Sequence, residues 1–402
     1  MANIYITGHR NPDLDTVCAA QAYATFKNII DPENHYIPVR CGHLSGNVKK
    51  VLATMGITPP PYMHDVYPKV KDVMLSEQYH VDADESLSQV AKHYRTDNPP
   101  AVPVYRGNDF YGLLTVDDIA TWYLQSLANN EIKEDPKISE VMGPQGEPLF
   151  EDERYEEAMQ RLLTSHLRGL PVVRGDEFVG YVTRRCFMER ISYNVIMVDH
   201  NEPEQSIPGV ETAKVLEIVD HHRLDSVKTD VPIFIDAEPV GSTCTIVYQL
   251  YRRNMMTPDR DTARVLLTGI MADTLILKSP TTTIVDVRSA QELSWITGED
   301  AREFGEKMFS ATEAMQSRDP KEAIESDFKI YHDHNIKVGI GQCEATTLMN
   351  LQDFKDIYLK TLEDVRLMHG LDWAMVMITD VLHERSILLS TDFRSRRHLP
   401  YT

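Results

Sequence analysis

Short apolar runs that end in polar residues recur along the chain, and they predict the strands of an α/β fold. Ile4–Thr7 is rich in residues that favour strands, and Val195–Val198 and Val215–Val219 have the same character. Helical periodicity covers Val17–Phe26 and the stretch from Ala263 to Leu277. Because open α/β sheets bind ligands at the carboxyl ends of their strands, we expect the polar residues that follow these strands to form a site.

An internal repeat separates the first of these strands from the other two. A constant offset of 68 positions aligns Val73-Met74 with Val141-Met142. Further pairs at this offset are Phe110 with Phe178, Gly112 with Gly180, and Thr115 with Thr183. Each copy predicts a helix, such as Ser86–Tyr94 in the first, then an apolar strand, a turn, a second strand and a closing helix. We therefore interpret roughly 68–190 as an insertion within one domain.

This repeat resembles a tandem pair of CBS domains, whose two copies pack together and hold an adenine nucleotide. The resemblance implies that AMP, ADP or ATP binds the pair and regulates the chain. Its Gly-x-x-Thr-x-x-Asp turn binds ribose and phosphate, which points to Thr115 and Asp118 in the first copy and to Thr183 in the second. Cys186 replaces the second Asp, which favours one competent ribose site over two. Arg168 is a candidate phosphate contact; alternatively, all these residues only form turns and surface.

The loop after the first strand carries candidate metal ligands. His9, Asp13 and Asp15 fall within seven residues, between the strand and the helix that follows it. One imidazole and two carboxylates suit a metal ion that accepts mixed nitrogen and oxygen ligands. Alternatively, an Asp near the start of a helix only caps that helix.

Three later segments add side chains of the same types. The second strand ends in Asp199-His200-Asn201, and the third ends in Asp220-His221-His222-Arg223. Asp273 stands among apolar neighbours in a predicted helix, where a charge is costly to bury unless it is paired or metal-bound. With the first loop, these segments offer more carboxylates and imidazoles than one ion needs. We therefore predict a two-metal site, the usual arrangement for in-line attack on a phosphoryl group.

The ordered motifs His9-Arg-Asn-Pro-Asp13-x-Asp15, Asp199-His-Asn and Asp220-His-His-Arg resemble those of the DHH phosphoesterase superfamily. Within it, the chain resembles the family II (manganese-dependent) inorganic pyrophosphatases that contain CBS domains. The resemblance spans essentially the whole chain. It implies an α/β fold in which a parallel-sheet DHH catalytic domain is interrupted by the α+β CBS pair and followed by a smaller α/β DHHA2 substrate-binding domain. The implied bounds are 1–65 and 192–310 for DHH, 68–125 and 136–190 for the CBS units, and 318–402 for DHHA2. The link from Leu127 to Lys137 leaves no room for the DRTGG domain of some members.

The resemblance also implies a role for each candidate residue. One metal would be held by His9, Asp13 and Asp199, and the other by Asp15, Asp199, His221 and Asp273, with Asp199 shared. His222 would contact the substrate and give a proton to the leaving phosphate, and Asp220 would orient the histidines. Lys329 would bind the electrophilic phosphate; without the family it would be taken for a solvated surface lysine. His200 is left out of the site, since a neighbouring imidazole can be structural.

The types of ligand indicate which metal ions the site would bind. Mixed His and Asp ligands favour Mn²⁺ or Co²⁺, with Mg²⁺ entering bound to pyrophosphate. Two such cations would lower the pKa of a bridging water, and the resulting hydroxide would attack one phosphorus.

Family members usually carry a C-terminal Ser-Arg-Lys-Lys segment, and Ser395-Arg396-Arg397 lies in the wrong context to supply it. We therefore expect an incomplete DHHA2 domain, either cut short or without part of its phosphate clamp.

Composition narrows the class of protein. The 402 residues carry a formal net charge of −20, which argues against binding a nucleic-acid backbone. No apolar run reaches the length of a membrane span, and the first residues lack a signal pattern. Five scattered cysteines without a C-x-x-C pair are typical of reduced thiols, so we expect a cytoplasmic protein. The resemblance further implies a homodimer.

Two other functions stay open at this point. A DHH phosphodiesterase acting on cyclic dinucleotides or short oligonucleotides shares the N-terminal motifs. Such enzymes usually carry a C-terminal Gly-Gly-Gly-His segment, which this sequence lacks. A catalytically weak protein that senses nucleotides is the second alternative, and the missing Ser-Arg-Lys-Lys segment keeps it open.

Overall fold

The chain forms two compact units, and the second is inserted into the first. The computed structural model describes residues 2–96, 99–189, 191–224, 229, 231–311, 319–333, 336–345, 351–380 and 385–391. The first unit comprises Met1–His64, Val195–Ile207 and Val215–Thr402, and the second comprises Asp65–Asn194 and Pro208–Lys214. No helix among the described residues is long and apolar enough to cross a membrane.

A five-stranded sheet forms the centre of the first unit. Its order is β11-β10-β9-β1-β2, in which β1 pairs with β2, and β10 with β11, in parallel. The strands are β1 (Asn3–Thr7), β2 (His35–Val39), β9 (Asn194–Val198), β10 (Lys214–Asp220) and β11 (Phe234–Ala237). The three strands predicted from apolar runs are therefore neighbours, so the polar loops after β1, β9 and β10 leave the same edge of the sheet.

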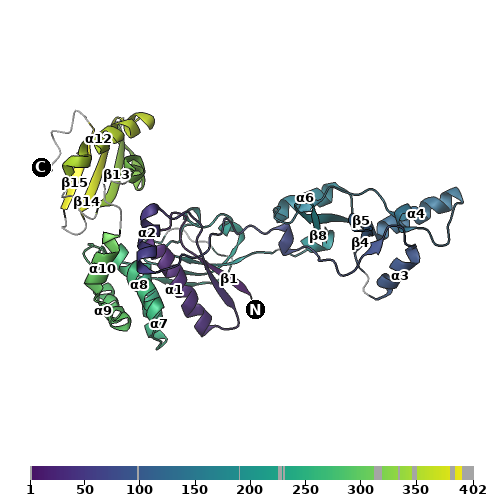
Figure 1. The fold of residues 1–402 in the computed structure, drawn as a ribbon, viewed down its shortest axis with the longest axis horizontal. Helices are drawn as coiled ribbons and strands as arrows, with labels where there is room; N and C mark the ends of the chain where they lie inside the picture. The colour runs from purple at the N-terminus through teal and green to yellow at the C-terminus, as the bar shows by residue number, and fades with distance from the viewer. Residues whose placement is uncertain are drawn as a thin grey trace. The chain divides into compact units, whose positions relative to one another are not determined.

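Helices cover this sheet and build the main core. They are α1 (Leu14–Ile30), α2 (Gly46–Met55), α7 (Thr243–Arg253), α8 (Arg260–Asp273), α9 (Ile284–Thr297) and α10 (Ala301–Ser310), with a short 3₁₀ turn, η3 (Pro203–Gln205). Helix α1 runs alongside β1, with α7 and α8 beside it (Figure 1). Tyr23 and Phe26 of α1 stack in this core, and Tyr251 of α7 packs against Phe26.

The prediction of a helix from Ala263 to Leu277 was wrong at its end. Helix α8 stops at Asp273, and Leu275, Ile276 and Leu277 adopt left-handed backbone conformations with φ between 50° and 63°. These three side chains still pack on the core, which is why the apolar pattern continues beyond the helix. The break leaves Asp273 at the helix terminus.

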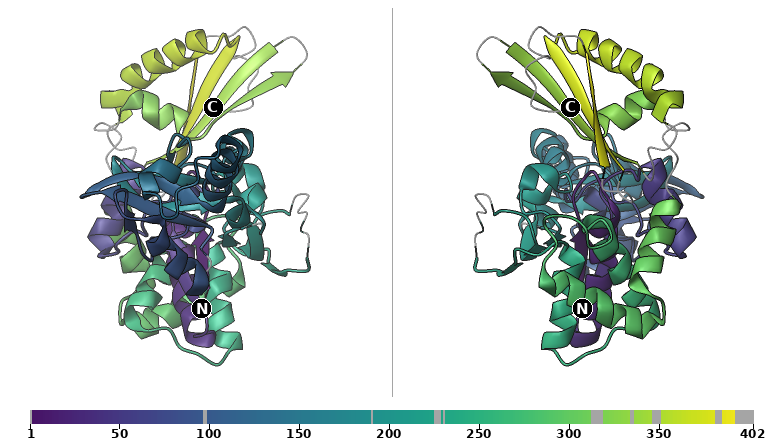
Figure 2. Two further views of the ribbon diagram at one scale, coloured as in Figure 1. Left: turned by 90° about the vertical axis from the view of Figure 1, so that its right-hand side faces the viewer. Right: turned by 90° about the vertical axis from the view of Figure 1, so that its left-hand side faces the viewer.

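The end of the first unit is a separate α/β layer. Its elements are α11 (Pro320–Glu325), β12 (Phe328–Asp333), β13 (Ile336–Ala345), α12 (Leu351–Met368), β14 (Trp373–Asp380) and β15 (Arg385–Ser390). The sheet order is β12-β13-β14-β15, with β13 and β14 parallel and the outer pairs antiparallel. Helices α11 and α12 pack on one face of this sheet (Figure 2). The expectation about Ser395-Arg396-Arg397 lies outside the described residues.

The second unit contains the repeat predicted at an offset of 68 residues. The first copy has β3 (Val81–Asp82), α3 (Leu87–Thr96), β4 (Ala101–Arg106), β5 (Asp109–Thr115) and α4 (Val116–Asn129), and the second has β6 (Leu149–Phe150), α6 (Tyr155–Thr164), β7 (Gly169–Arg174), β8 (Glu177–Thr183) and η2 (Arg184–Phe187). The remaining short elements are η1 (Val70–Asp72), α5 (Ile138–Val141) and η4 (Val210–Thr212). Each three-stranded sheet pairs its strands in the same way, and even the register shift recurs, at Val104/Tyr105 and Val172/Val173.

The two copies meet through equivalent side chains but end differently. Phe110 and Phe178, which occupy the same repeat position, stack with ring centroids 4.0 Å apart. The expected closing helix exists only in the first copy, as α4. In the second copy it is the single 3₁₀ turn η2, because the chain must reach β9 at Asn194 soon afterwards.

Candidate metal centre

The loops after β1, β9 and β10 bring carboxylates and imidazoles together. In each of two groups the potential ligand atoms lie within 4.8 Å of one another. The first group is His9, Asp13 and Asp199, and the second is Asp15, Asp199, His221 and Asp273. These are the residues that the sequence analysis divided between two metal ions, and Asp199 belongs to both groups. A third group joins Asp199 and His221 to His222.

Asp199 is held in place by neighbours on both sides of its carboxylate. Its side chain is 1% exposed, and Oδ2 accepts a hydrogen bond from Thr16 Oγ1 at 2.5 Å, while Oδ1 accepts one from Thr243 Oγ1 at 2.9 Å. The Nε2 atoms of His9 and His221 lie 3.6 and 3.4 Å from the carboxylate. Burial disfavours the charged form, yet His221 and His9 outweigh it and hold the pKa of Asp199 well below its usual value.

The backbone at Asp199 is also unusual. Its φ of 61° lies in the left-handed region, which costs a residue other than glycine about 1–2 kcal/mol. Strained backbone of this kind persists where the surroundings fix it, and it is concentrated at functional sites. The sequence analysis did not predict this conformation.

His221 has the geometry of a metal ligand. Its Nδ1 donates to the carbonyl oxygen of Val240 at 3.0 Å, so in the neutral imidazole Nε2 carries the lone pair that a metal would accept. Nε2 is buried without a hydrogen-bond partner and faces Asp199 and Asp273 at 3.4 and 3.3 Å. Burial alone lowers its pKa, but the carboxylates of Asp199 and Asp15 raise it to about 9. An orphaned buried imidazole nitrogen among carboxylates fits a divalent metal.

Asp15 belongs to the first turn of α1, and its carboxylate lies at the amino terminus of α7. Its carboxylate is fully buried and accepts hydrogen bonds from Ser242 Oγ at 2.6 Å, from the Thr243 backbone N–H at 2.6 Å and from that of Cys244 at 3.1 Å. Burial and the charge of Asp199 raise the pKa of Asp15 to about 6. The position of Gly269 has to be glycine, since a Cβ there would lie 2.7 Å from Asp15 Oδ1. The sequence analysis did not identify Ser242 and Thr243 as partners of this carboxylate. Their place at the start of a helix, where backbone N–H groups bind anions, was the signal that could have indicated them.

Asp13 performs both of the tasks that the sequence left open. Its Oδ1 accepts a hydrogen bond from the Thr16 backbone N–H at 2.9 Å and so caps α1. Its Oδ2 lies 3.4 Å from His9 Nε2, on the side of the ligand group. Burial lowers the pKa of His9, but Asp13 and the other nearby carboxylates raise it overall.

Asp220 orients only one of the two histidines, which corrects the expectation that it serves both. Asp220 is buried, and its Oδ1 lies 2.8 Å from His222 Nδ1, while its Oδ2 accepts from Asn201 Nδ2 at 2.6 Å. His221 is oriented by a backbone carbonyl instead. The hydrogen bond to Asp220 raises the pKa of His222, whose side chain is about half exposed.

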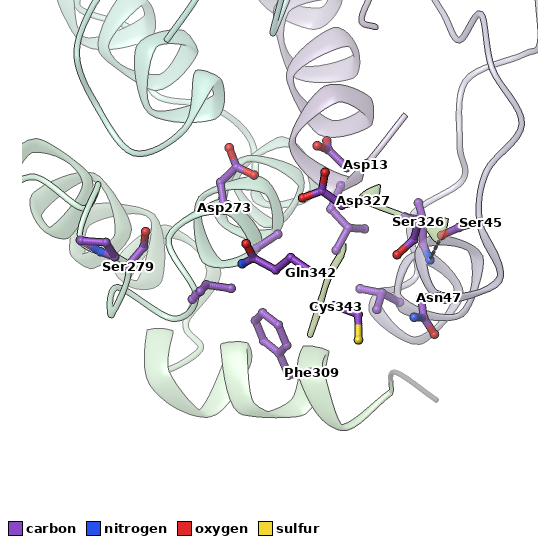
Figure 3. A pocket seen from close by; sticks show the side chains of 16 residues that line it. Asp13, Ser45, Asn47, Asp273, Ser279, Phe309, Ser326, Asp327, Gln342 and Cys343 are labelled. Atoms are coloured by element: carbon purple, nitrogen blue, oxygen red, sulfur yellow. Dashed lines mark hydrogen bonds between the residues drawn. The ribbon is translucent and has the colours of Figure 1, made fainter. Parts of the chain in front are cut away.

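A cavity of about 680 Å³ opens beside the ligand groups (Figure 3). Asp13, which precedes α1, and Asp273, at the end of α8, line one side of it. Asp327 and Gln342, from the segment between α11 and β13, line it as well. Lys329 is not among its lining residues. The Lys329 side chain is 69% exposed, and its Nζ lies 3.5 Å from Asp327 Oδ1.

Comparison with known proteins places this arrangement in a family. A model described as the DHH family, N-terminal domain, matches residues 3–270, more than half of the chain. This chain belongs to the DHH family. A DHHA2 domain model matches residues 306–398, which include the segment from α11 to β15.

Relatives of this DHH-family chain are named as pyrophosphatases. A cobalt-dependent inorganic pyrophosphatase of Clostridium perfringens is 26% identical over 498 residues, covering 96% of this chain and 90% of that protein. A manganese-dependent inorganic pyrophosphatase of Methanothrix thermoacetophila is 36% identical over 195 residues, 48% of this chain and 63% of that protein. A crystal structure of a candidate family II inorganic pyrophosphatase from Methanococcus jannaschii covers 99% of this chain and 97% of its own, with a TM-score of 0.52 at 21% identity. That structural likeness supports the fold alone.

The inserted unit of the DHH-family chain has its own pocket, of about 440 Å³. Thr115, Asp118 and Arg168 line it, whereas Thr183 is not among its lining residues. Asp118 Oδ2 accepts from the backbone N–H and from Oγ1 of Thr115, each at 2.7 Å, and Arg168 pairs with Asp117. The structure thus brings together three of the four residues predicted to bind a nucleotide.

Proposed function

We propose that this chain is a metal-dependent inorganic pyrophosphatase that hydrolyses pyrophosphate to two phosphates and is regulated by adenine nucleotides. The observation that carries this proposal is the position of Asp199 in two adjoining ligand groups. A carboxylate shared by two ions is the usual core of sites that hydrolyse phosphoanhydrides. The pyrophosphatase names of the relatives support the substrate.

The ligand groups define where Mn²⁺ or Co²⁺ would bind. His9, Asp13 and Asp199 would hold one ion, and Asp15, Asp199, His221 and Asp273 the other, with Mg²⁺ entering with the substrate. When bound, the ions supply Lewis acidity and a low pKa for the attacking water. The chain contributes the fixed geometry, since Thr16 and Thr243 hold both oxygens of Asp199 before any substrate arrives.

His222 is the proposed proton donor to the leaving phosphate. Asp220 accepts from its Nδ1 at 2.8 Å, which fixes the ring and favours the protonated imidazole. The His222 side chain is about half exposed and lies near Asp199, so it can reach a substrate held beside that carboxylate. Lys329 is proposed to bind the electrophilic phosphate, for which it must exchange its contact with Asp327.

The inserted repeat is the proposed regulatory element. Thr115 and Asp118 would bind the ribose and phosphate of AMP, ADP or ATP, with Arg168 near the phosphate and Thr183 as the weaker counterpart in the second copy. The pocket that gathers the first three supports this assignment. The proposal includes a homodimer, which light scattering would test by a mass of about twice 45.9 kDa.

Phosphate release from pyrophosphate tests the proposed function. The chain is stripped with a chelator, resupplied with Mn²⁺ or Co²⁺ plus Mg²⁺, and assayed with and without AMP. We expect release that requires the transition metal and that AMP suppresses. An aryl phosphodiester serves as the competing substrate, and its cleavage without release from pyrophosphate would replace the proposal with a phosphodiesterase. AMP binding without turnover of either substrate would indicate a nucleotide sensor.

A further inference from the structure

His200 follows the shared carboxylate, and the proposed function gives it no task. Its side chain is 3% exposed, and its Nδ1 lies 2.8 Å from the carbonyl oxygen of Val198. A carbonyl oxygen can only accept, so Nδ1 carries the proton and donates it. The hydrogen bond therefore joins the two residues on either side of Asp199.

The residue enclosed by this bond is the one with the left-handed backbone. Asp199 has a φ of 61°, while its N–H still donates to the Val219 carbonyl oxygen at 3.0 Å, as an extension of the β9–β10 pairing. The chain thus leaves the sheet at Asp199 itself. A turn of this kind reverts to ordinary strand geometry unless another contact fixes it. The His200–Val198 bond is placed to do so.

We propose that His200 is a positioning residue that locks the left-handed turn at Asp199 and so presents its carboxylate to both ligand groups. This rests on the proposed function, because the two groups matter only if ions occupy them. Reverting the turn would swing the carboxylate away from one of the groups. The hydroxyls of Thr16 and Thr243 would then lose their acceptor as well.

The surroundings of the second ring nitrogen of His200, Nε2, favour a positioning role for this residue over a role as a metal ligand. His200 belongs to none of the metal-ligand groups found in the described part of the chain. Its Nε2 is buried without a hydrogen-bond partner, and its ring meets that of His9 edge-on, with centroids 6.5 Å apart. Among the described residues, Nδ1 alone of the two ring nitrogens has a hydrogen-bond partner, so the role of the side chain depends on that nitrogen.

Two amide variants separate the roles of the two ring nitrogens. In His200→Asn the amide nitrogen takes the place of Nδ1 and can still donate to Val198, whereas in His200→Gln it takes the place of Nε2. The readout is Co²⁺ affinity, followed through the visible absorption of the bound ion in the full chain. We expect His200→Asn to bind Co²⁺ as the wild type does, and His200→Gln and His200→Ala to bind about tenfold more weakly or worse.

Controls keep the outcome interpretable. His35→Gln, at the exposed start of β2, should leave Co²⁺ affinity unchanged. Equal losses in the Asn and Gln variants would overturn the proposal, as would wild-type Co²⁺ affinity in both despite lowered melting temperatures. The comparison uses metal binding alone, so a failure to hydrolyse pyrophosphate would refute the proposed function without deciding the role of His200.

A second measurement does not depend on the variants folding. The ¹⁵N spectrum of the wild-type histidines reports which ring nitrogen carries the proton. We expect His200, assigned in the wild type through its backbone resonances, to show a protonated Nδ1 with slow exchange and an unprotonated Nε2. A His200 tautomer with the proton on Nε2 would overturn the proposal.

Discussion

The candidate metal centre and the pocket of the inserted unit both contain several carboxylates, but their surroundings hold these carboxylates differently. Asp15 and Asp199 are 0% and 1% exposed and are bound by hydroxyl and backbone donors that stay in place. In the pocket, Asp117 and Arg168 are each about half exposed and paired with each other. The centre is therefore organised in advance, whereas the pocket has partners that a ligand must exchange.

This difference matches the tasks proposed for the two sites. Catalysis gains most from groups whose orientation is fixed before the charge of the transition state develops. Regulation requires a ligand to shift an equilibrium, and it can do so only by making contacts that differ between two states. A surface pair such as Arg168 with Asp117 is weak enough to be replaced by a phosphate.

Removing the shared carboxylate should have the largest effect. In Asp199→Ala both ligand groups lose a member, so we expect phosphate release to fall by at least on the order of 10³-fold. Calorimetric titration with AMP should show unchanged binding, since the pocket lies in the other unit. Asp261→Asn, an exposed carboxylate on α8, is the matched control. Near-normal turnover in Asp199→Ala would contradict the shared role.

Removing the hydroxyl partners of Asp199 comes next. Thr16→Val and Thr243→Val keep the shape of the side chain but leave one carboxylate oxygen without its donor, so metal affinity should fall by about 10–100-fold. Titration with Co²⁺ measures the change. Thr16→Ser and Thr243→Ser retain the hydroxyl and should stay near the wild type. Valine and serine variants that behaved alike would show that packing, not the hydrogen bond, matters.

The two copies of the repeat provide their own control for nucleotide binding. Asp118→Ala removes the acceptor proposed for the ribose, and the AMP dissociation constant should rise about tenfold. Cys186 occupies the equivalent place after Thr183, with Sγ 3.3 Å from the Thr183 backbone nitrogen. Cys186→Ala should therefore leave AMP affinity nearly unchanged. Equal effects of the two variants, or none from Asp118→Ala, would move the ligand elsewhere.

The smallest effect tests whether the pocket partners are exchangeable. Asp117→Asn frees Arg168 for the phosphate, so AMP should bind about two- to fivefold more tightly. Arg168→Ala should weaken AMP binding and not that of adenosine, which lacks the phosphate. Isothermal titration of both ligands measures these differences. Weaker AMP binding in Asp117→Asn would indicate that the ion pair itself shapes the site.

The sequence indicated which carboxylates and imidazoles lie together, because this grouping follows from residue type and from position along the chain. Carboxylates and imidazoles after parallel strands must meet at one edge of the sheet, and Asp273 was conspicuous among apolar neighbours. The repeat was also visible in the sequence, since the spacing of 68 residues is kept in the paired strands that contain Phe110 and Phe178.

The parts that sequence reasoning missed depend on tertiary contacts. Thr16 and Thr243 look like ordinary residues at helix starts, and only the fold brings their hydroxyls to Asp199. Residue type alone does not predict the left-handed turn at Asp199, because Asp adopts this conformation only occasionally. Apolar periodicity ran past the end of α8, because Leu275 and Ile276 pack on the core without being helical.

The most direct test of the account is electron paramagnetic resonance of the full chain titrated with Mn²⁺. If Asp199 is shared by two ions, two Mn²⁺ should bind per chain and give an exchange-coupled spectrum, which Asp199→Ala should abolish. A spectrum of isolated, uncoupled Mn²⁺ at saturating metal would contradict the two-ion centre.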